Sequence, residues 1–240
     1  MVLTLNSGQL SKRLQTVANF IPKGAKLADI GSDHAYLPCF LANKGLIVSA
    51  IAGEVVEGPY TTAKRQVEAE NLENIIQVRL GNGLEVISPG EVDCISIAGM
   101  GGALISDILE VGKGKLEGVK RLVLQPNIAA WTIRKWLYEN NWELVNEDIL
   151  EEDGKIYEVL VAERGNPAYP YESGLETGLL FGPFLLKSKK EPFLKKWKLE
   201  KENWQIVLER LSLAKPSDEV SAKKDELQKK IALVEEVLNQ

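Results

Sequence analysis

The stretch KLADIGSDHAYLP, residues 26–38, decides the fold class of this chain. An apolar strand runs into DIG at residues 29–31, where a nucleotide-binding fold turns from its first strand into its first helix. A dinucleotide-binding turn would supply further glycines here, because bare backbone has to approach a pyrophosphate. The chain instead has SDH at residues 32–34. Since carboxylates repel phosphate, the turn predicts a nucleotide-like ligand without a diphosphate.

Outward from this turn, short apolar strands alternate with helical stretches up to about residue 165. Such alternation predicts βαβ units and a mostly parallel sheet with helices on both faces. The last two strands are separated only by EEDGK, which contains Gly154 and predicts an antiparallel hairpin at the sheet edge. The expected strands are residues 26–30, 47–52, 75–80, 92–98, 119–124, 142–149 and 156–163, and the expected helices are residues 36–44, 57–71, 102–111 and 129–140.

The chain beyond residue 165 is different in character. GNPAYPY is a punctuated linker, and the remainder has two helical segments with apolar residues at heptad-like spacing. Between these segments, Pro216 is expected to end one helix and Ser217 to cap the next. Each apolar seam is shorter than three heptads, which favours a helical hairpin over a long coiled coil. We therefore expect an α/β domain at residues 1–165 and a helical domain at residues 166–240.

Composition limits the possible functions. The 240 residues are 45% hydrophobic and 26% charged, as in an ordinary globular chain. The start of the chain turns polar within a few residues, and no apolar run approaches the ~20 residues that cross a bilayer, so we expect a cytoplasmic protein. Cys39 and Cys94 have no CxxC partner, and His34 is the single histidine. Neither a metal site nor a Ser-His-Asp triad is expected.

Charge is distributed unevenly along the chain. Residues 1–166 contain 16 Lys and Arg against 22 Asp and Glu, whereas residues 167–240 contain 13 against 12. KSKKEPFLKKWKLEK at residues 187–201 carries seven lysines and two glutamates. This run is either a solvated helix face or a patch that contacts phosphates, and Phe193 and Trp197 within it suit the second interpretation. Local potential governs such attraction even in an acidic protein.

Polar residues and glycines follow the expected parallel strands, at the edge where open α/β sheets bind ligands. Gly31 lets backbone approach a ligand closely. Glu54 follows the second strand, where its carboxylate can accept both hydroxyls of a ribose, and the amide of Asn82 can pair with an adenine edge. The carboxylates of Asp29 and Asp33 favour a ligand that carries a positively charged group. Together these residues predict a ligand with an adenosine and a cationic group but no diphosphate.

Several of these residues also have structural explanations. Asp29 can cap the helix that follows it, and Asn127 can cap the helix that begins at Ile128. Met100 can fill core, although it lies between glycines in AGMGG at residues 98–102. His34 can either contact a cofactor or pack at the start of a helix. The sequence leaves these alternatives open.

Six motifs occur in a characteristic order: LSKRLQTVANFI, LADIGSDHAYLP, AGEVVEGP, GNGLEVI, IAGMGG and LQPN. With the helical tail behind them, they resemble the bacterial tRNA adenine(22)-N1-methyltransferase family, within the class I S-adenosylmethionine-dependent methyltransferases. The resemblance covers the whole chain, and DIGSDHAYLP with IAGMGG is its specific part. It implies a Rossmann-like methyltransferase sheet. Asn82 departs from the Asp that class I enzymes usually have at the adenine-facing position.

The residues and the resemblance together assign candidate roles. For S-adenosyl-L-methionine binding the candidates are Asp29, Gly31, His34, Glu54, Asn82, Gly83, Ala98, Gly99, Met100 and Gly101. For positioning the acceptor base they are Met100, Gln125, Pro126 and Asn127. For tRNA they are Lys12, Arg13, Lys187, Lys189, Lys190, Lys195, Lys196 and Lys198. We expect no metal, no membrane partner and a monomer.

The implied reaction transfers a methyl group from the sulfonium to N1 of an adenine in tRNA. N1 has a lone pair in the neutral base, so no general base is required, and orientation can contribute ~7–11 kcal/mol. Because N1 lies on the Watson–Crick edge, the adenine must be unpaired or flipped out. Two alternatives stay open: a methyltransferase acting on a small molecule or protein, and a non-catalytic nucleotide-binding module whose hairpin recruits a partner.

Overall fold

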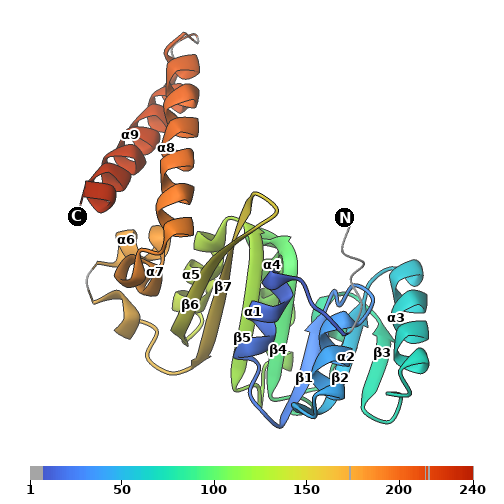
Figure 1. Ribbon diagram of the computed structural model, residues 1–240. Coiled ribbons are helices and arrows are strands. Elements are labelled where there is room, and N and C mark those ends of the chain that lie inside the picture. The colour runs from blue at the N-terminus through green and yellow to red at the C-terminus, as the bar shows by residue number, and fades with distance from the viewer. Residues whose placement is uncertain (1–7, 173, 214, 216, 240) are drawn as a thin grey trace.

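The computed structural model describes residues 8–172, 174–213, 215 and 217–239. Within these residues the strands form one seven-stranded sheet of order β3-β2-β1-β4-β5-β7-β6. Figure 1 shows its strands from β3 at the right to β6 at the left. Neighbours from β3 to β5 are parallel, and β7 is antiparallel to both β5 and β6. The predicted mostly parallel sheet with an antiparallel edge is confirmed. The strands are β1 (Ala25–Ile30), β2 (Ile47–Glu54), β3 (Ile76–Leu80), β4 (Cys94–Gly101), β5 (Arg121–Ile128), β6 (Trp142–Glu152) and β7 (Lys155–Arg164).

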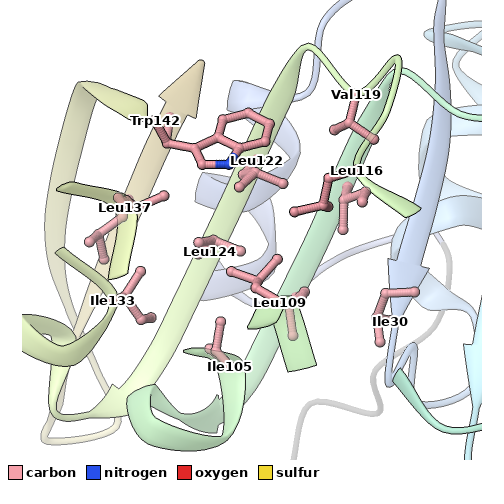
Figure 2. Close-up of a cluster of buried hydrophobic side chains, with 14 of the residues drawn as sticks. Ile30, Ile105, Leu109, Leu116, Val119, Leu122, Leu124, Ile133, Leu137 and Trp142 are labelled. Carbon is pink, nitrogen blue, oxygen red and sulfur yellow. The ribbon is translucent and has the colours of Figure 1, made fainter. Parts of the chain in front are cut away.

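Helices cover both faces of this sheet because alternate strand residues point to opposite sides. In β1, Leu27 packs with one core cluster and Ala28 with the other. Figure 2 shows the second cluster, where side chains from α4 and α5 meet Leu122 and Leu124 of β5. The helices of the α/β part are α1 (Lys12–Phe20), α2 (Tyr36–Asn43), α3 (Glu57–Ala69), α4 (Gly102–Val111) and α5 (Ala130–Glu139), with short 3₁₀ turns η1 (Gly83–Val86), η2 (Lys113–Lys115) and η3 (Tyr169–Tyr171).

Cys39 and Cys94 are buried free thiols in the core. Burial raises the pKa of each thiol to about 12. A thiol with so high a pKa stays protonated at neutral pH and is a poor nucleophile.

The edge hairpin forms where the sequence predicts it. Asp153 and Gly154 connect β6 to β7, and both have positive φ, at 50° and 73°. A two-residue hairpin turn of this kind needs left-handed backbone at both positions, which suits Asp-Gly. β7 lies between β5 and β6, so the later strand of the hairpin joins the parallel sheet and β6 forms its edge.

The remaining helices form the predicted hairpin and its base. They are α6 (Leu175–Phe181), α7 (Pro183–Ser188), α8 (Glu191–Ser212) and α9 (Asp218–Asn239). Figure 1 shows α8 and α9 side by side, projecting away from the sheet. At the base, Phe181, Phe193 and Trp197 pack with Val234 of α9 and Ile149 of β6. The hairpin is therefore rooted on the edge strand of the sheet.

The junction between α8 and α9 contains the helix cap that the sequence predicts. Ser217 Oγ accepts a hydrogen bond from Val220 N–H at 3.2 Å, which confirms the predicted N-cap of α9. Pro216, predicted to end the preceding helix, lies outside the described residues.

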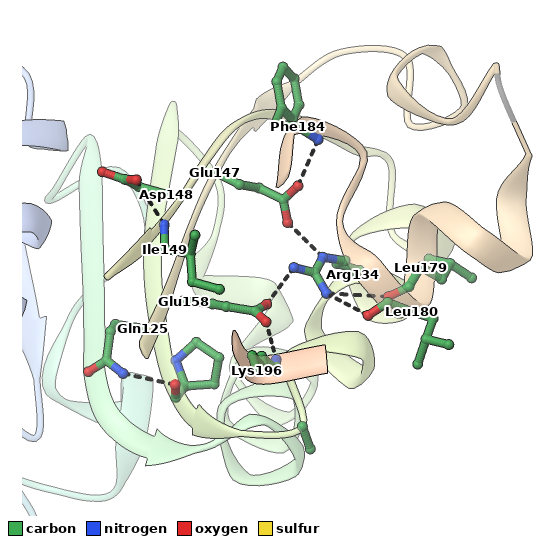
Figure 3. A network of polar contacts seen from close by, with 12 residues as sticks. Gln125, Arg134, Glu147, Asp148, Ile149, Glu158, Leu179, Leu180, Phe184 and Lys196 are labelled. Atoms are coloured by element: carbon green, nitrogen blue, oxygen red, sulfur yellow. Dashed lines mark hydrogen bonds and ion pairs between the residues drawn. The ribbon is translucent and has the colours of Figure 1, made fainter. Parts of the chain in front are cut away.

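A buried ion network joins the helical part to the α/β part (Figure 3). Arg134 of α5 is fully buried. Its Nε donates to Glu147 Oε1 of β6 at 2.6 Å, and its Nη2 donates to Glu158 Oε2 of β7 at 2.5 Å. Nη1 donates to the carbonyl of Leu180 in α6 at 3.2 Å. One guanidinium thus ties α5 to both hairpin strands and to α6.

The carboxylates of this network also bind α7 and α8. Phe184 N–H donates to Glu147 Oε2 at 3.1 Å, and Lys196 of α8 forms an ion pair with Glu158 Oε1. Burial alone would raise the pKa of Glu158, but the charges of Lys196 and Arg134 outweigh it and hold that pKa below its usual value. Glu158 is therefore ionised at neutral pH and bound from two sides.

Replacing Arg134 by Gln should strongly destabilise the protein, because it leaves Glu147 and Glu158 buried without their shared cation. Breaking a buried pair in this way costs about 3–5 kcal/mol of unfolding free energy. Lys135→Gln is the matched control, since Lys135 forms only an exposed pair with Glu139 at 3.8 Å, worth little. Urea denaturation of both variants measures the difference. Equal, small losses would show that the network does not stabilise the fold.

Candidate functional site

The carboxyl ends of four parallel strands meet at one edge of the sheet. In the pairing register, Ile30 of β1 lies beside Gly53 of β2 and Ile97 of β4, and Ala98 of β4 lies beside Gln125 of β5. The structure therefore brings together the turn after β1, Glu54, AGMGG and LQPN. This proximity is predicted by the sequence, because parallel strands end at a common edge.

Asp29 lies beneath this edge, near the end of β1. It is buried, and its two carboxylate oxygens accept hydrogen bonds from Ser32 Oγ and Ser96 Oγ, each at 2.6 Å. Burial raises the pKa of Asp29, and the two hydroxyl hydrogen bonds offset only part of that rise. Asp29 does not cap the next helix: α2 begins at Tyr36 after Ala35, whose side chain makes no cap. The alternative of a helix cap is wrong, because the carboxylate is already used by two serines.

Glu54 is tied to the turn that follows β1. It is buried, and its Oε1 accepts a hydrogen bond from Asp33 N–H at 2.7 Å. Asp33, His34 and Ala35 all have positive φ, at 44°, 67° and 56°. Three successive left-handed residues without glycine are strained, and such strain persists where surrounding contacts impose it. The Glu54 hydrogen bond is one contact that holds this strained turn.

The local field at this turn is negative. Burial raises the pKa of Glu54; the Asp33 N–H hydrogen bond lowers it, and the nearby charges of Asp29 and Asp33 raise it again. His34 lies beside this cluster, with Nε2 3.3 Å from Asp33 Oδ1 and its ring stacked on Tyr36 at 5.2 Å between centroids. Carboxylates gathered in this way suit a cationic ligand with hydroxyl groups and oppose a diphosphate.

Gly31 and Met100 face each other across the edge. Gly31 has φ of +68°, and a Cβ added there would lie 2.2 Å from Met100 Cε. Met100 also packs against the core cluster beneath α4 and α5. The side chain of Met100 is thus partly core and partly a cover over the β1 turn, and its role in lining a ligand site stays a prediction.

The side-chain amide of Gln125 holds the glycine turn in place through hydrogen bonds to its backbone. It is fully buried, and its Oε1 accepts hydrogen bonds from Gly99 N–H at 3.0 Å and from Arg13 Nη1 at 2.5 Å. Its Nε2 donates to the carbonyl of Pro126 at 2.8 Å. One amide therefore fixes the backbone on both sides of the β4–β5 edge and holds Arg13 against it.

Asn127 completes this arrangement. Its Nδ2 donates to the carbonyl of Gly99 at 2.8 Å, so both backbone groups of Gly99 are held by side chains of LQPN. Helix α5 begins at Ala130 after Ala129, which has φ of +57° and no side-chain cap. The expectation that Asn127 caps this helix is wrong, because its amide is directed at Gly99. Gly101, in turn, lies beside Ile128 in the register.

Arg13 reaches the site from α1. Besides its bond to Gln125, its guanidinium lies over the Tyr157 ring of β7 at 5.5 Å. The first backbone N–H groups of α1, those of Lys12 and Arg13, donate to the Glu152 carboxylate at 2.5 and 3.1 Å, and Lys12 Nζ donates to the Glu151 carbonyl at 3.0 Å. Sequence reasoning missed this arrangement, because the partners are more than a hundred residues apart.

Asn82 and Gly83 lie beside the end of β3. The side chain of Asn82 is exposed, and its backbone N–H donates to Glu85 Oε2 at 3.1 Å. Gly83 has φ of +54°, and Ile108 of α4 lies 3.0 Å from the position of an added Cβ. Both residues are among those that line a groove of about 450 Å³ between η1 and α4. Asn82 therefore lies at the rim of the site as the residue that precedes η1, where it forms a capping box with Glu85.

The lysine run is largely engaged within the protein. Lys190 pairs with Asp148 at 2.7 Å and Lys195 with Glu151 at 2.5 Å, both on β6, while Lys196 pairs with Glu158. Lys189 Nζ donates to the Val237 carbonyl of α9 at 2.9 Å. Lys187 and Lys198 are exposed and form no ion pair with any described residue. Much of the run is therefore the seam between α8 and the edge hairpin.

Metal ligands and membrane spans are both absent from the described part of the chain. Among the described residues, no group of His, Cys, Asp and Glu is placed to hold a metal ion. No helix within the same residues is long and apolar enough to cross a membrane.

Comparison with known proteins decides the family. A family model described as tRNA (adenine(22)-N(1))-methyltransferase matches residues 27–236. This chain belongs to that family. A Bacillus subtilis family member, tRNA (adenine(22)-N(1))-methyltransferase, is 53% identical over 236 residues, which are 98% of this chain and 99% of the relative.

Solved structures of the family agree in fold. The crystal structure of the B. subtilis m1A22 tRNA methyltransferase is 54% identical, covers 96% of this chain and 99% of its own, and has a TM-score of 0.93. Streptococcus pneumoniae Sp1610, in complex with S-adenosyl-L-methionine, is 46% identical, covers 96% of this chain and 100% of its own, and has a TM-score of 0.85. The helical hairpin thus belongs to the shared family fold.

Replacing Gln125 by Leu should loosen the glycine turn, because it leaves Gly99 N–H and the Pro126 carbonyl without their partner. A buried group left unsatisfied costs about 1–3 kcal/mol, so urea denaturation should show a loss of that size. Gln77→Leu, at an exposed position on β3, is the control and should change stability little. A loss no larger for Gln125→Leu than for the control would contradict the organising role.

Proposed function

We propose that this protein transfers a methyl group from S-adenosyl-L-methionine to N1 of adenine 22 in tRNA. Family membership supports this function, and so does the S-adenosyl-L-methionine complex of Sp1610. The observation that carries it here is the pairing of a carboxylate-rich turn after β1 with a glycine turn fixed by Gln125 and Asn127. The first suits a cationic, hydroxyl-bearing cofactor, and the second leaves backbone close to the reacting centre.

The residues of the edge fit this cofactor. Asp33 N–H occupies Oε1 of Glu54, while among the described residues no hydrogen bond is made to Oε2, so that oxygen is available to a ribose hydroxyl. Asn82 offers an exposed amide to an adenine edge. Gly31, under the side chain of Met100, permits close approach of backbone. His34, Gly83, Ala98, Gly99 and Gly101 complete the proposed cofactor site.

The cofactor would supply an electrophilic methyl group, and the chain would supply orientation. N1 of adenine attacks with its own lone pair, so no residue has to remove a proton first. Met100, Gln125, Pro126 and Asn127 are the proposed positioning residues for the base, and they lie at the same edge as Gly31. Holding the two reactants in line can contribute ~7–11 kcal/mol to the barrier reduction.

We infer a division of labour between residues 1–165, which bind the cofactor and carry out transfer, and residues 166–240, which bind tRNA. Exposed Lys187 and Lys198 support the second role. We also infer a monomer that acts in the cytoplasm. The apolar seams of α8 and α9 support the monomer, because Trp197, Leu227 and Val234 are buried within the chain.

Mass-spectrometric mapping of methylated nucleosides in tRNA treated with the purified protein tests the proposed function. The expected product is 1-methyladenosine at position 22, formed only with S-adenosyl-L-methionine. Methylation of a protein or small molecule but not of tRNA, or no turnover at all, would contradict the proposal.

Replacing Glu54 by Gln should weaken S-adenosyl-L-methionine binding about tenfold to a hundredfold, since a hydrogen bond to a charged group contributes about 1.5–3 kcal/mol. The wild-type affinity should also fall on acidification. Burial raises the pKa of Glu54, so protonation begins at a higher pH than for an ordinary glutamate, and the ionised acceptor is lost as pH falls. Calorimetry across a pH series should show this slope in the wild type and a flatter one in Glu54→Gln. Identical affinities and slopes would exclude Glu54 from the cofactor site.

Replacing both Lys187 and Lys198 by Ala should weaken tRNA binding and make log affinity less steep against log salt, by roughly 0.7–0.9 for each phosphate that is no longer neutralised. The control replaces exposed Lys23 and Lys120, which precede β1 and β5 at the opposite edge of the sheet. Binding measured across a salt series compares the two double variants. If the slope changes equally in both, the effect is one of net charge and the two α7–α8 lysines do not touch tRNA.

A further inference from the structure

A groove lies between the turn after β5 and α8. Pro126 and Asn127, proposed above to position the target base, line one part of it, and the part that faces α8 has no assigned occupant. Its volume is about 270 Å³. It is formed on one side by the β5–α5 turn, on another by α8, and at its base by the edge hairpin. The lining residues used below are Ile128, Glu158, Lys196, Leu199, Glu200 and Asn203.

Ile128 forms the boundary between this groove and the glycine turn. It is the last residue of β5 and is 72% exposed. It lies beside Gly101 in the register, with its Cγ1 3.9 Å from the position of a Cβ added there. A β-branched side chain so exposed at the site gains stabilisation only when a ligand covers it. Leu199 of α8, 48% exposed, faces the groove from the other part of the molecule.

The charges in the groove favour a neutral, flat group over a phosphate. Glu158 and Glu200 both line it, and the Lys196 charge is already paired with Glu158. Because Lys196 and Glu158 offset each other's charge, the Glu200 carboxylate is the remaining charge of the lining, and it repels a phosphate. Asn203 adds an exposed amide that offers both a donor and an acceptor to a base edge. Two aliphatic walls and an amide are the features that bind a nucleobase by its faces and its edge.

We propose that this groove binds the base of a nucleotide adjacent to the target adenine, between Ile128 and Leu199. The inference rests on the proposed function. Extruding an adenine removes the stacking partner of its neighbours, which costs a few kcal/mol, and a side chain that covers a neighbouring base recovers part of that cost. The groove is continuous with the glycine turn through Ile128 and lies between the two parts that tRNA has to contact.

Ile128→Ala tests this site. The expected result is about a fivefold to tenfold fall in kcat/KM for tRNA, from the apolar contact area with the base that the shorter side chain loses, with unchanged S-adenosyl-L-methionine affinity by calorimetry. Val48→Ala is the matched control, because Val48 is 62% exposed near the start of β2, at the opposite edge of the sheet. It should keep the wild-type rate. Leu199→Ala, on the other wall, should resemble Ile128→Ala.

A tRNA with an abasic site next to adenine 22, on its 5′ or its 3′ side, identifies the base concerned. For one of the two substrates the wild-type rate should fall to that of Ile128→Ala on intact tRNA, and the variant should slow little further. Two outcomes would overturn the groove proposal. In the first, the abasic site slows Ile128→Ala by the same factor as the wild type for both substrates; in the second, Ile128→Ala is as active as the wild type on intact tRNA. If the wild type does not methylate intact tRNA, the proposed function itself fails, and that outcome is distinct from both.

Discussion

A guanidinium without access to water requires its whole charge to be balanced by the chain, and Arg134 imposes that requirement on the centre of this molecule. Glu147 and Glu158 meet it from the two strands of the edge hairpin, and a carbonyl of α6 completes the set. Lys196 then draws α8 onto the same carboxylate pair. The position of the helical hairpin relative to the sheet therefore depends on one buried cation in α5.

The same helix begins at Ala130, with only Ile128 and Ala129 between it and LQPN. Any shift of α5 that disturbed Arg134 would also move the turn in which Gln125 and Asn127 hold Gly99. The strained turn after β1 is held in a comparable way, because Glu54 binds Asp33 N–H while the backbone around His34 remains left-handed. The turn after β1 and the glycine turn are thus both held by side-chain hydrogen bonds from within the chain, and fixed geometry of this kind is what catalysis by orientation requires.

Much of the fold could be predicted from local pattern. Apolar strands buried on both faces, an Asp-Gly turn at residues 153–154 and the cap at Ser217 are encoded in short stretches of sequence, and all are present. The meeting of strand ends followed from the parallel topology. Local pattern could not predict partners far along the chain. The insertion of β7 between β5 and β6, and the pairing of α8 lysines with hairpin carboxylates 38–44 residues earlier, depend on tertiary packing. A lysine-rich run looks the same in sequence whether it contacts RNA phosphates or acids of its own fold.

Some contacts that hold helix α1 can form only late in the synthesis of the chain. Its first N–H groups donate to Glu152, 140 and 139 residues further on, and a helix of nine residues is marginal in water by itself. The hydroxyl of Ser11 caps α1 locally by accepting a hydrogen bond from Leu14 N–H, whereas the Glu152 carboxylate is synthesised only with the edge hairpin. Among the described helices, α1 therefore gains its contacts with Glu151 and Glu152 only after the edge hairpin has been synthesised.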